Sequence, residues 1–176
     1  PFVVAYPDDI VLGEKPLSKQ LIETWEKTGN TVLSVQELEE DQLWRYGVIE
    51  PDGEGKIMKV NKMVEKPASG NAPSRFVSFG RYLYTPELFD SLRASDKSHS
   101  SKSEFTQTEA INHMASQGHV SAVQFEGTRY DLGDPLGFLT SAMQIGLQRS
   151  EFKETLLDEM RRLIKLHDNP NDDNSG

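Results

Sequence analysis

The chain contains no cysteine and only four histidines among its 176 residues. Without cysteine there can be no disulfide bond, no thiolate nucleophile and no Cys-ligated zinc ion. The histidines stand at no metal-ligand spacing, which makes zinc chemistry a poor hypothesis. The chain also lacks an apolar run near the roughly 20 residues that a membrane helix needs, and it lacks the basic start of a signal peptide. These absences predict a cytoplasmic protein with no membrane partner.

Positive charge is scarce as well, since 19 Lys and Arg residues stand against 28 Asp and Glu residues, for a formal net charge of -9. Nucleic acids are held by clustered Lys and Arg, so this balance argues against a nucleic-acid partner. A small anionic ligand remains compatible, because it needs only a few local cations or a divalent metal held by carboxylates. The length and the 36% hydrophobic content suit one domain with an ordinary core.

Apolar periodicity predicts a layered α/β fold. Residues 2–6 form a nearly continuous apolar run, which is typical of a strand buried on both faces, and residues 31–35 indicate another strand. Between them, apolar residues at helical spacing over 17–27 and the stop signal Gly29-Asn30 indicate an amphipathic helix. The order strand, helix, strand favours a layered sheet with right-handed crossovers.

Antiparallel strands are expected further along the chain. Two strand-like runs, 48–50 and 56–60, flank a Gly-rich turn sequence over 52–55, which indicates a hairpin. The other expected elements are strands over 76–84 and 120–125, a mobile loop over 95–103, and helices from 106, from 135 and over 152–164.

One domain is expected over residues 1–166, with a disordered tail over 167–176. The last expected helix carries an apolar stripe from Phe152 to Ile164. That stripe must pack on this domain or on a partner subunit, which leaves a homo-oligomer open.

The sequence Val64-Glu65-Lys66-Pro67 places an acid and a base beside a residue that favours turns. Adjacent strand residues point to opposite faces, so Glu65 and Lys66 can reach one ligand only if the chain turns there. A lysine ammonium would suit the phosphate of a sugar phosphate, and a carboxylate would suit sugar hydroxyls. A surface ion pair at a strand end is the alternative interpretation.

Two aspartates far apart in the sequence, Asp8 and Asp131, each follow an expected strand. The sheet could bring both carboxylates to one rim, because ligands gather beyond the carboxyl ends of strands in open α/β sheets. Such a pair would suit Mg²⁺, which is usually held by one or two carboxylates together with substrate phosphates. Each residue could instead form a turn, and Asp134 is explained as the N-cap before Pro135.

Gly47, Gly80 and Arg81 are further candidate substrate contacts. A missing side chain lets a ligand approach the backbone, although either glycine could be an ordinary strand residue. Arg81 could bind an anion or lie solvated on an exposed face.

Five short motifs follow one another along the chain: Pro7-Asp8-Asp9, Tyr46-Gly47, Glu65-Lys66-Pro67, Gly80-Arg81-Tyr82 and Tyr130-Asp131-Leu132-Gly133-Asp134. As an ordered set they resemble the sugar-binding half of the bacterial UTP:glucose-1-phosphate uridylyltransferases, or UDP-glucose pyrophosphorylases. These enzymes belong to the wider sugar-phosphate nucleotidyltransferase family, and the resemblance runs from Pro1 to about Leu166. It implies a Rossmann-like α/β/α nucleotidyltransferase core with a mixed sheet whose N-terminal strands are missing.

The resemblance implies a Mg²⁺-dependent transferase that forms UDP-glucose and pyrophosphate from UTP and glucose 1-phosphate. It implies that Asp8 and Asp131 ligate Mg²⁺ and that Lys66 contacts the phosphate of glucose 1-phosphate, which would make these three the catalytic residues. Glu65 and Gly47 would contact the sugar. Two alternatives stay open: a related sugar-nucleotide synthase such as a thymidylyltransferase, and a non-catalytic sugar-phosphate-binding domain, which would not depend on magnesium.

The chain departs from the family pattern at two places. It has neither a G-x-G-x-x-G nor a Walker-type loop, and the family's N-terminal glycine-rich loop for the nucleotide triphosphate is absent. Residues 103–109 read Ser103-Glu104-Phe105-Thr106-Gln107-Thr108-Glu109, where the family more often has a Gly-Glu-Ile-Gln-Leu-Thr-Asp-like run.

Because the glycine-rich loop is absent, this chain by itself is expected to lack catalytic activity and to be the C-terminal part of a longer enzyme. The measurement is a uridine-incorporation assay on the isolated chain with UTP, glucose 1-phosphate and Mg²⁺. Normal turnover would contradict the expectation.

Overall fold

The computed structural model describes residues 1–98 and 107–168, which fall into two compact units. Unit 1 comprises Pro1–Arg129, and unit 2 begins at Tyr130. The sequence-based expectation of one domain over 1–166 stays a prediction.

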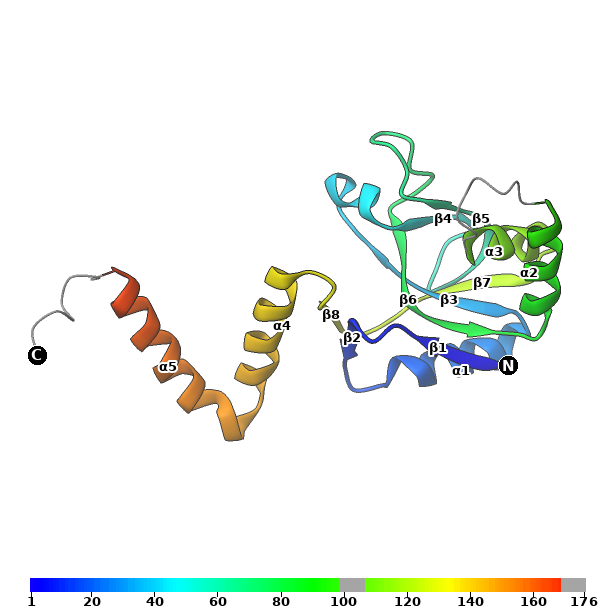
Figure 1. The fold of residues 1–176 in the computed structure, drawn as a ribbon. Helices are drawn as coiled ribbons and strands as arrows, with labels where there is room; N and C mark the ends of the chain where they lie inside the picture. The colour runs from blue at the N-terminus through cyan, green and yellow to red at the C-terminus, as the bar shows by residue number, and fades with distance from the viewer. Residues whose placement is uncertain (99–106, 169–176) are drawn as a thin grey trace, which may run out of the picture. The chain divides into compact units, whose positions relative to one another are not determined.

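Unit 1 is built on a six-stranded mixed sheet (Figure 1). In spatial order its strands are β1 (Phe2–Ala5), β6 (Phe76–Tyr84), β3 (Thr31–Glu37), β7 (Val120–Gln124), β5 (Ile57–Glu65) and β4 (Gly47–Asp52). β3 and β7 run parallel, whereas the other neighbours run antiparallel. β4 also pairs with β6, which places Gly47 opposite Ser78. The expected hairpin and the expected mixed sheet are confirmed.

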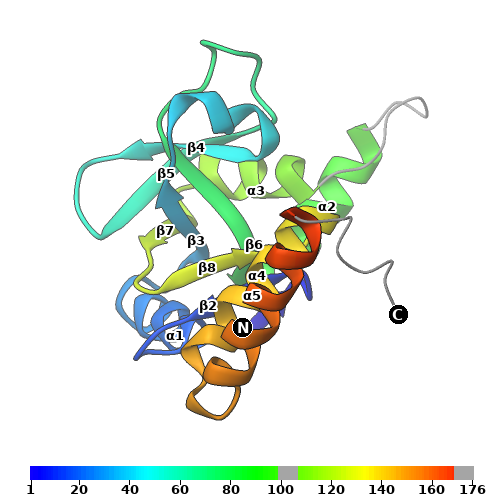
Figure 2. The same ribbon diagram turned by 90° about the vertical axis from the view of Figure 1, so that its left-hand side faces the viewer.

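Helices cover both faces of this sheet (Figures 1 and 2). α1 (Leu17–Thr28) contacts β3 and β6 on one face, and α3 (Gln107–Ser116) packs on β5 on the other face, beside α2 (Glu87–Ser98). A 3-10 helix, η1 (Glu40–Arg45), connects β3 to β4. The expected α/β/α layering is therefore confirmed.

Two apolar clusters fill the layers between the sheet and its helices. Ile111 and Met114 of α3 belong to one cluster, and Leu21 of α1 belongs to the other. Alternation along β3 supplies both, because Val32 packs with the α1 cluster and Leu33 packs with the α3 cluster. These core residues are fully buried, so each face of the sheet is anchored by its own helix.

The end of α1 follows from one glycine. Gly29 has a φ of 71°, in the left-handed region that glycine adopts without the penalty that a Cβ brings. Its N–H donates to the carbonyl of Trp25 at 2.7 Å and closes the last turn. The expected stop of this helix is confirmed.

β1 is an edge strand of the described sheet, and the expected burial of both its faces is not observed among the described residues. Among the described strands it pairs only with β6, and Phe2 and Val3 are each 37% exposed. An edge strand has a hydrogen-bonded neighbour on one side only, and the expectation that strands next to β1 are missing from this chain stays a prediction.

The expected loop over 95–103 also needs correction in part. Residues 95–98 form the end of α2, because the helix started by Glu87 continues to Ser98. Residues 99–103 lie outside the described residues.

A separate two-stranded sheet joins β2 (Asp9–Leu12) to β8 (Thr128–Asp131), and Thr128 and Arg129 at the start of β8 belong to unit 1. The backbones approach each other closely beside Gly127. A Cβ on Gly127 would lie 2.9 Å from the carbonyl oxygen of Leu12, so only glycine fits at this position.

Unit 2 consists mainly of α4 (Pro135–Gln148) and α5 (Ser150–Asp168), which pack on each other. Asp134 caps α4 as expected, since its carboxylate accepts the N–H of Gly137 at 2.9 Å. α5 continues through Asp168, and residues 169–176 of the expected tail lie outside the described residues. Among the helices that the structure describes, none is long and apolar enough to cross a membrane.

Two neighbouring residues of α1 test this packing. Leu21 is fully buried and Ile22 is 41% exposed, so Leu21→Ala should lower the free energy of unfolding by about 2–5 kcal/mol and Ile22→Ala by less than about 1 kcal/mol. Urea denaturation followed by circular dichroism measures both. Equal losses for the two variants would show that the buried face of α1 is assigned incorrectly.

Candidate functional site

A cavity of about 150 Å³ opens in unit 1 where β4, β5 and β6 meet the first residue of α3. Three predicted substrate contacts line it: Gly47, Glu65 and Gly80. The other lining residues are Tyr6, Asp9, Met63, Ser78, Phe79, Tyr82 and Gln107. The fold thus gathers side chains from distant parts of the sequence around one small, polar hollow.

Gly47 leaves room for the carboxylate of Glu65. The two residues lie opposite each other in the β4–β5 register, and a Cβ on Gly47 would lie 3.1 Å from Glu65 Oε2 and 3.2 Å from the sulfur of Met63. Thr108 at the start of α3 donates its hydroxyl to the same Glu65 oxygen at 3.4 Å. A side chain on Gly47 would therefore push the acid out of the position in which it lines the cavity.

The chain turns at Lys66, as the Glu-Lys-Pro sequence predicts. Lys66 has a φ of 45°, and it is the one non-glycine residue with a positive φ in the described part of the chain. Its N–H donates to the carbonyl of Tyr46 at 3.0 Å, which ties the turn to the residue before Gly47. A left-handed conformation costs a residue with a Cβ about 1–2 kcal/mol, and such strain concentrates at functional sites. The turn is confirmed, whereas the ligand of Lys66 stays a prediction.

Close packing against Tyr6 explains why residue 80 is a glycine. A Cβ there would lie 2.8 Å from the Cβ of Tyr6, so the side chain of Tyr6 fills the space that a ligand was expected to enter. The N–H of Tyr6 also donates to the carbonyl of Gly80 at 2.8 Å. Arg81 does not line the cavity, and its Nη2 donates to the backbone carbonyl of Asp9 at 3.1 Å. Substrate contacts by Gly80 and Arg81 stay predictions.

Asp9 is a cavity residue that sequence reasoning missed. Its Oδ2 accepts the N–H of Gly80 at 3.0 Å, and its Oδ1 forms an ion pair with the Nε of Arg129. Both side chains are only 14% exposed, so solvent screens this pair much less than it screens a surface pair. The available signal was the position of Asp9 directly after Asp8, just beyond the strand expected over residues 2–6.

Ser78, Tyr82 and Gln107 were also missed. Ser78, Gly80 and Tyr82 alternate along β6, and the two-residue period of a strand could have found them once Gly80 was suspected. Gln107 accepts the hydroxyl of Tyr84 at 3.1 Å and donates to the hydroxyl of Tyr82 at 3.4 Å. Burial raises the pKa of Tyr82 and of Tyr84, because it disfavours the charged phenolate.

The predicted metal ligands belong to different units, Asp8 to unit 1 and Asp131 to unit 2, and their convergence stays a prediction. Asp8 is exposed in the turn after β1, and its carboxylate forms no hydrogen bond or ion pair with another described residue. Asp131 Oδ1 accepts the N–H of Gly133 at 3.0 Å, which closes a local turn.

Within the described ranges, no three His, Asp or Glu side chains come together in a way that could hold a metal ion. Mg²⁺ does not need such a cluster, because it is commonly held by one or two carboxylates, several waters and the phosphates of a substrate. The exposed carboxylate of Asp8 fits that type of binding.

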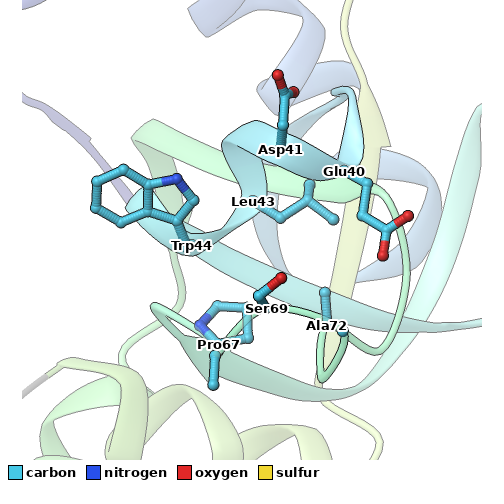
Figure 3. A pocket seen from close by; sticks show the side chains of 9 residues that line it. Glu40, Asp41, Leu43, Trp44, Pro67, Ser69 and Ala72 are labelled. Atoms are coloured by element: carbon cyan, nitrogen blue, oxygen red, sulfur yellow. The ribbon is translucent and has the colours of Figure 1, made fainter.

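A second cavity, of about 480 Å³, is larger but contains none of the predicted site residues. Figure 3 shows it between η1, with the exposed indole of Trp44, and the loop over 67–72 that follows Lys66. Its charged lining residues are the acids Glu40 and Asp41, with no lysine or arginine. That lining does not suit a phosphate, so the smaller cavity is the candidate site.

The nucleotidyl transferase family matches residues 2–147. UTP--glucose-1-phosphate uridylyltransferase of Staphylococcus epidermidis is 41% identical over 164 residues, which cover 93% of this chain and 56% of that protein. The protein of the same name from Staphylococcus haemolyticus is 40% identical over the same shares.

Solved structures of UDP-glucose pyrophosphorylases have a fold similar to that of this chain. A UDP-glucose pyrophosphorylase complexed with UDP-glucose aligns with a TM-score of 0.76 and 29% identity, over 84% of this chain and 57% of that chain. UDP-glucose pyrophosphorylase from Acinetobacter baumannii aligns with a TM-score of 0.79 over 92% of this chain and 56% of that chain. Its 22% identity supports the fold alone.

The family match extends over the strands, helices and cavity of unit 1 and continues into α4. The chain spans little more than half the length of the relatives that it matches. The resemblance carried by its five ordered motifs is confirmed at the level of sequence and of fold: this chain belongs to the nucleotidyl transferase family.

Proposed function

We propose that this chain supplies the sugar-phosphate-binding part of a Mg²⁺-dependent UTP:glucose-1-phosphate uridylyltransferase. One observation carries the proposal: Gly47, Glu65 and Gly80 line a single polar cavity, and the left-handed turn at Lys66 directly follows Glu65. The names of the staphylococcal relatives support the choice of substrates. Because the chain covers 56% of those proteins, the complete reaction belongs to the proposal.

The cavity offers the groups that a hexose needs. Glu65 accepts hydrogen bonds from sugar hydroxyls, while Ser78, Tyr82 and Gln107 can each donate as well as accept. Sugar hydroxyls likewise donate and accept, so such a mixed lining can satisfy several of them at once.

Lys66 would bind the phosphate. Its side chain is exposed, and its backbone, which directly follows Glu65, is fixed by the hydrogen bond to Tyr46. An ammonium paired with a phosphate oxygen forms a charge-assisted hydrogen bond, which is roughly twice as strong as a neutral one. In this arrangement the sugar ring occupies the cavity and its phosphate remains outside, in contact with Lys66.

In the proposed reaction a phosphate oxygen of glucose 1-phosphate attacks the α-phosphorus of UTP. A new P–O bond forms, the bond from that phosphorus to the bridging oxygen of the β-phosphate breaks, and pyrophosphate leaves with the electron pair. UDP-glucose results, and no covalent enzyme intermediate is needed. The chain contributes by orienting the nucleophile and by neutralising charge on phosphate oxygens through Lys66.

Asp8 and Asp131 would hold the Mg²⁺ ion, which when bound neutralises charge on the phosphates. Their carboxylates are the ligand type that Mg²⁺ prefers, and each stands in one of the ordered motifs. The cytoplasmic location and the homo-oligomer stay predictions.

Lys66→Ala should weaken the binding of glucose 1-phosphate to the chain by about tenfold to a hundredfold, because a hydrogen bond to a charged group is worth about 1.5–3 kcal/mol. Isothermal titration calorimetry measures the affinity. Lys66→Gly should bind as weakly, yet it should unfold at least as late as Lys66→Ala on heating, because glycine relieves the left-handed strain.

The matched control for Lys66 is Lys62→Ala, which changes an exposed lysine of the preceding strand β5 and should bind glucose 1-phosphate like the unaltered chain. Equal losses in the Lys66 and Lys62 variants would mean that general positive charge, rather than a phosphate contact by Lys66, supports binding.

Asp8→Asn and Asp131→Asn test the metal assignment. Mg²⁺ should strengthen the binding of UDP-glucose to the unaltered chain, and each variant should lose most of that gain, about tenfold, while keeping its affinity in EDTA. Calorimetric titrations with and without Mg²⁺ measure the difference, and Asp41→Asn, an exposed acid of η1, is the control. An unchanged magnesium effect in both variants would refute the assignment.

A further inference from the structure

One arginine makes contact with three segments of the cavity wall. The guanidinium of Arg129 pairs with Asp9, lies over the ring of Phe79 at 4.0 Å from the ring centroid, and lies 5.3 Å from the ring centroid of Tyr46. Arg129 itself does not line the cavity. It contacts two residues that do, Asp9 and Phe79.

Each of these contacts adjoins a residue of the proposed site. Asp9 follows Asp8, and its carboxylate accepts a hydrogen bond from the N–H of Gly80. Phe79 lies directly before Gly80, and both line the cavity.

The third contact concerns the other side of the cavity. Tyr46 lies directly before Gly47, and its carbonyl accepts the N–H of Lys66 at 3.0 Å. A shift of Tyr46 would thus move both the sugar-facing strand β4 and the turn that carries the proposed phosphate ligand. Arg129 connects this segment to β2 and β6 through one rigid group.

The chemistry of the guanidinium explains why an arginine can do this. It is planar, so its flat faces stack on aromatic rings while its edge donates N–H groups to a carboxylate. The low exposure of the pair with Asp9 keeps that contact from being screened by water. A lysine could keep the charge but would lose the flat surface that contacts Phe79 and Tyr46.

We propose that Arg129 is a positioning residue of the sugar-phosphate cavity, which holds the segments of Asp9, Phe79 and Tyr46 in the arrangement that binds glucose 1-phosphate. The inference rests on the proposed function, because it assumes that this cavity is the sugar-phosphate site. It goes beyond that function by assigning the shape of the cavity to a side chain that does not touch the substrate.

The experiment measures affinity and stability together. Arg129→Met keeps an apolar stem that reaches about as far as the Nε of arginine, but it removes the charge and the planar face. Its affinity for glucose 1-phosphate, measured by calorimetry well below its unfolding temperature, should fall about tenfold or more. Arg129→Lys should restore part of the unfolding temperature through the pair with Asp9, yet it should recover less than half of the lost binding free energy.

Leu21→Ala is the matched control for loss of stability. Leu21 is a fully buried residue of α1 that does not line the cavity, so this variant should unfold earlier while binding glucose 1-phosphate with unchanged affinity. A role for Arg129 in stability alone would make its variants behave like Leu21→Ala, and that result would overturn the inference while leaving the proposed function intact.

The other outcomes are equally distinct. Binding by Arg129→Lys that equals the unaltered chain would overturn the inference, because charge without a planar face would then suffice, and this variant decides the question if Arg129→Met does not fold. No binding of glucose 1-phosphate by the unaltered chain would overturn the proposed function and the inference with it.

Discussion

The arrangement of the candidate site depends on the carboxylate of Asp9. One of its oxygens accepts the N–H of Gly80 on β6, and the other pairs with Arg129 at the start of β8, so a single side chain joins three separate parts of unit 1. Removing either partner would leave a largely buried charge without compensation, which is far more costly than losing a surface pair. The turn after β1, which carries Asp8, is fixed by this interaction.

The cavity exists because small residues let larger ones approach. The side chain of Tyr6 packs against the backbone of Gly80, and Gly47 leaves room for the carboxylate of Glu65. The sequence predicts that both glycines let a ligand approach the backbone. In the structure they leave room for neighbouring side chains of the protein. Those neighbours then form the wall that a ligand would meet, so the glycines shape the cavity indirectly.

Lys66 has a strained backbone conformation that its neighbours maintain. The residue before a proline normally avoids helical backbone angles, and a left-handed conformation there is maintained only because the surrounding contacts determine it. The hydrogen bond to Tyr46 is one such contact, and Tyr46 in turn lies beneath the guanidinium of Arg129. The proposed phosphate ligand is therefore held by the same network that holds the sugar cavity, which suits a reaction that relies on orientation rather than on a covalent intermediate.

Local sequence signals predicted several elements, because α1 with its stop at Gly29, the hairpin of β4 and β5, the cap at Asp134 and the turn at Lys66 all follow from local chemistry. β2, η1 and β8 were not expected. The sequence also indicated the family, because short motifs in a fixed order can be recognised without knowledge of the fold. It could not show that Asp9, rather than another acid, pairs with Arg129, since these residues are 120 positions apart. Such facts depend on which strands become neighbours, and strand pairing is decided by the packing of the whole sheet between its two helix layers, which no local pattern encodes.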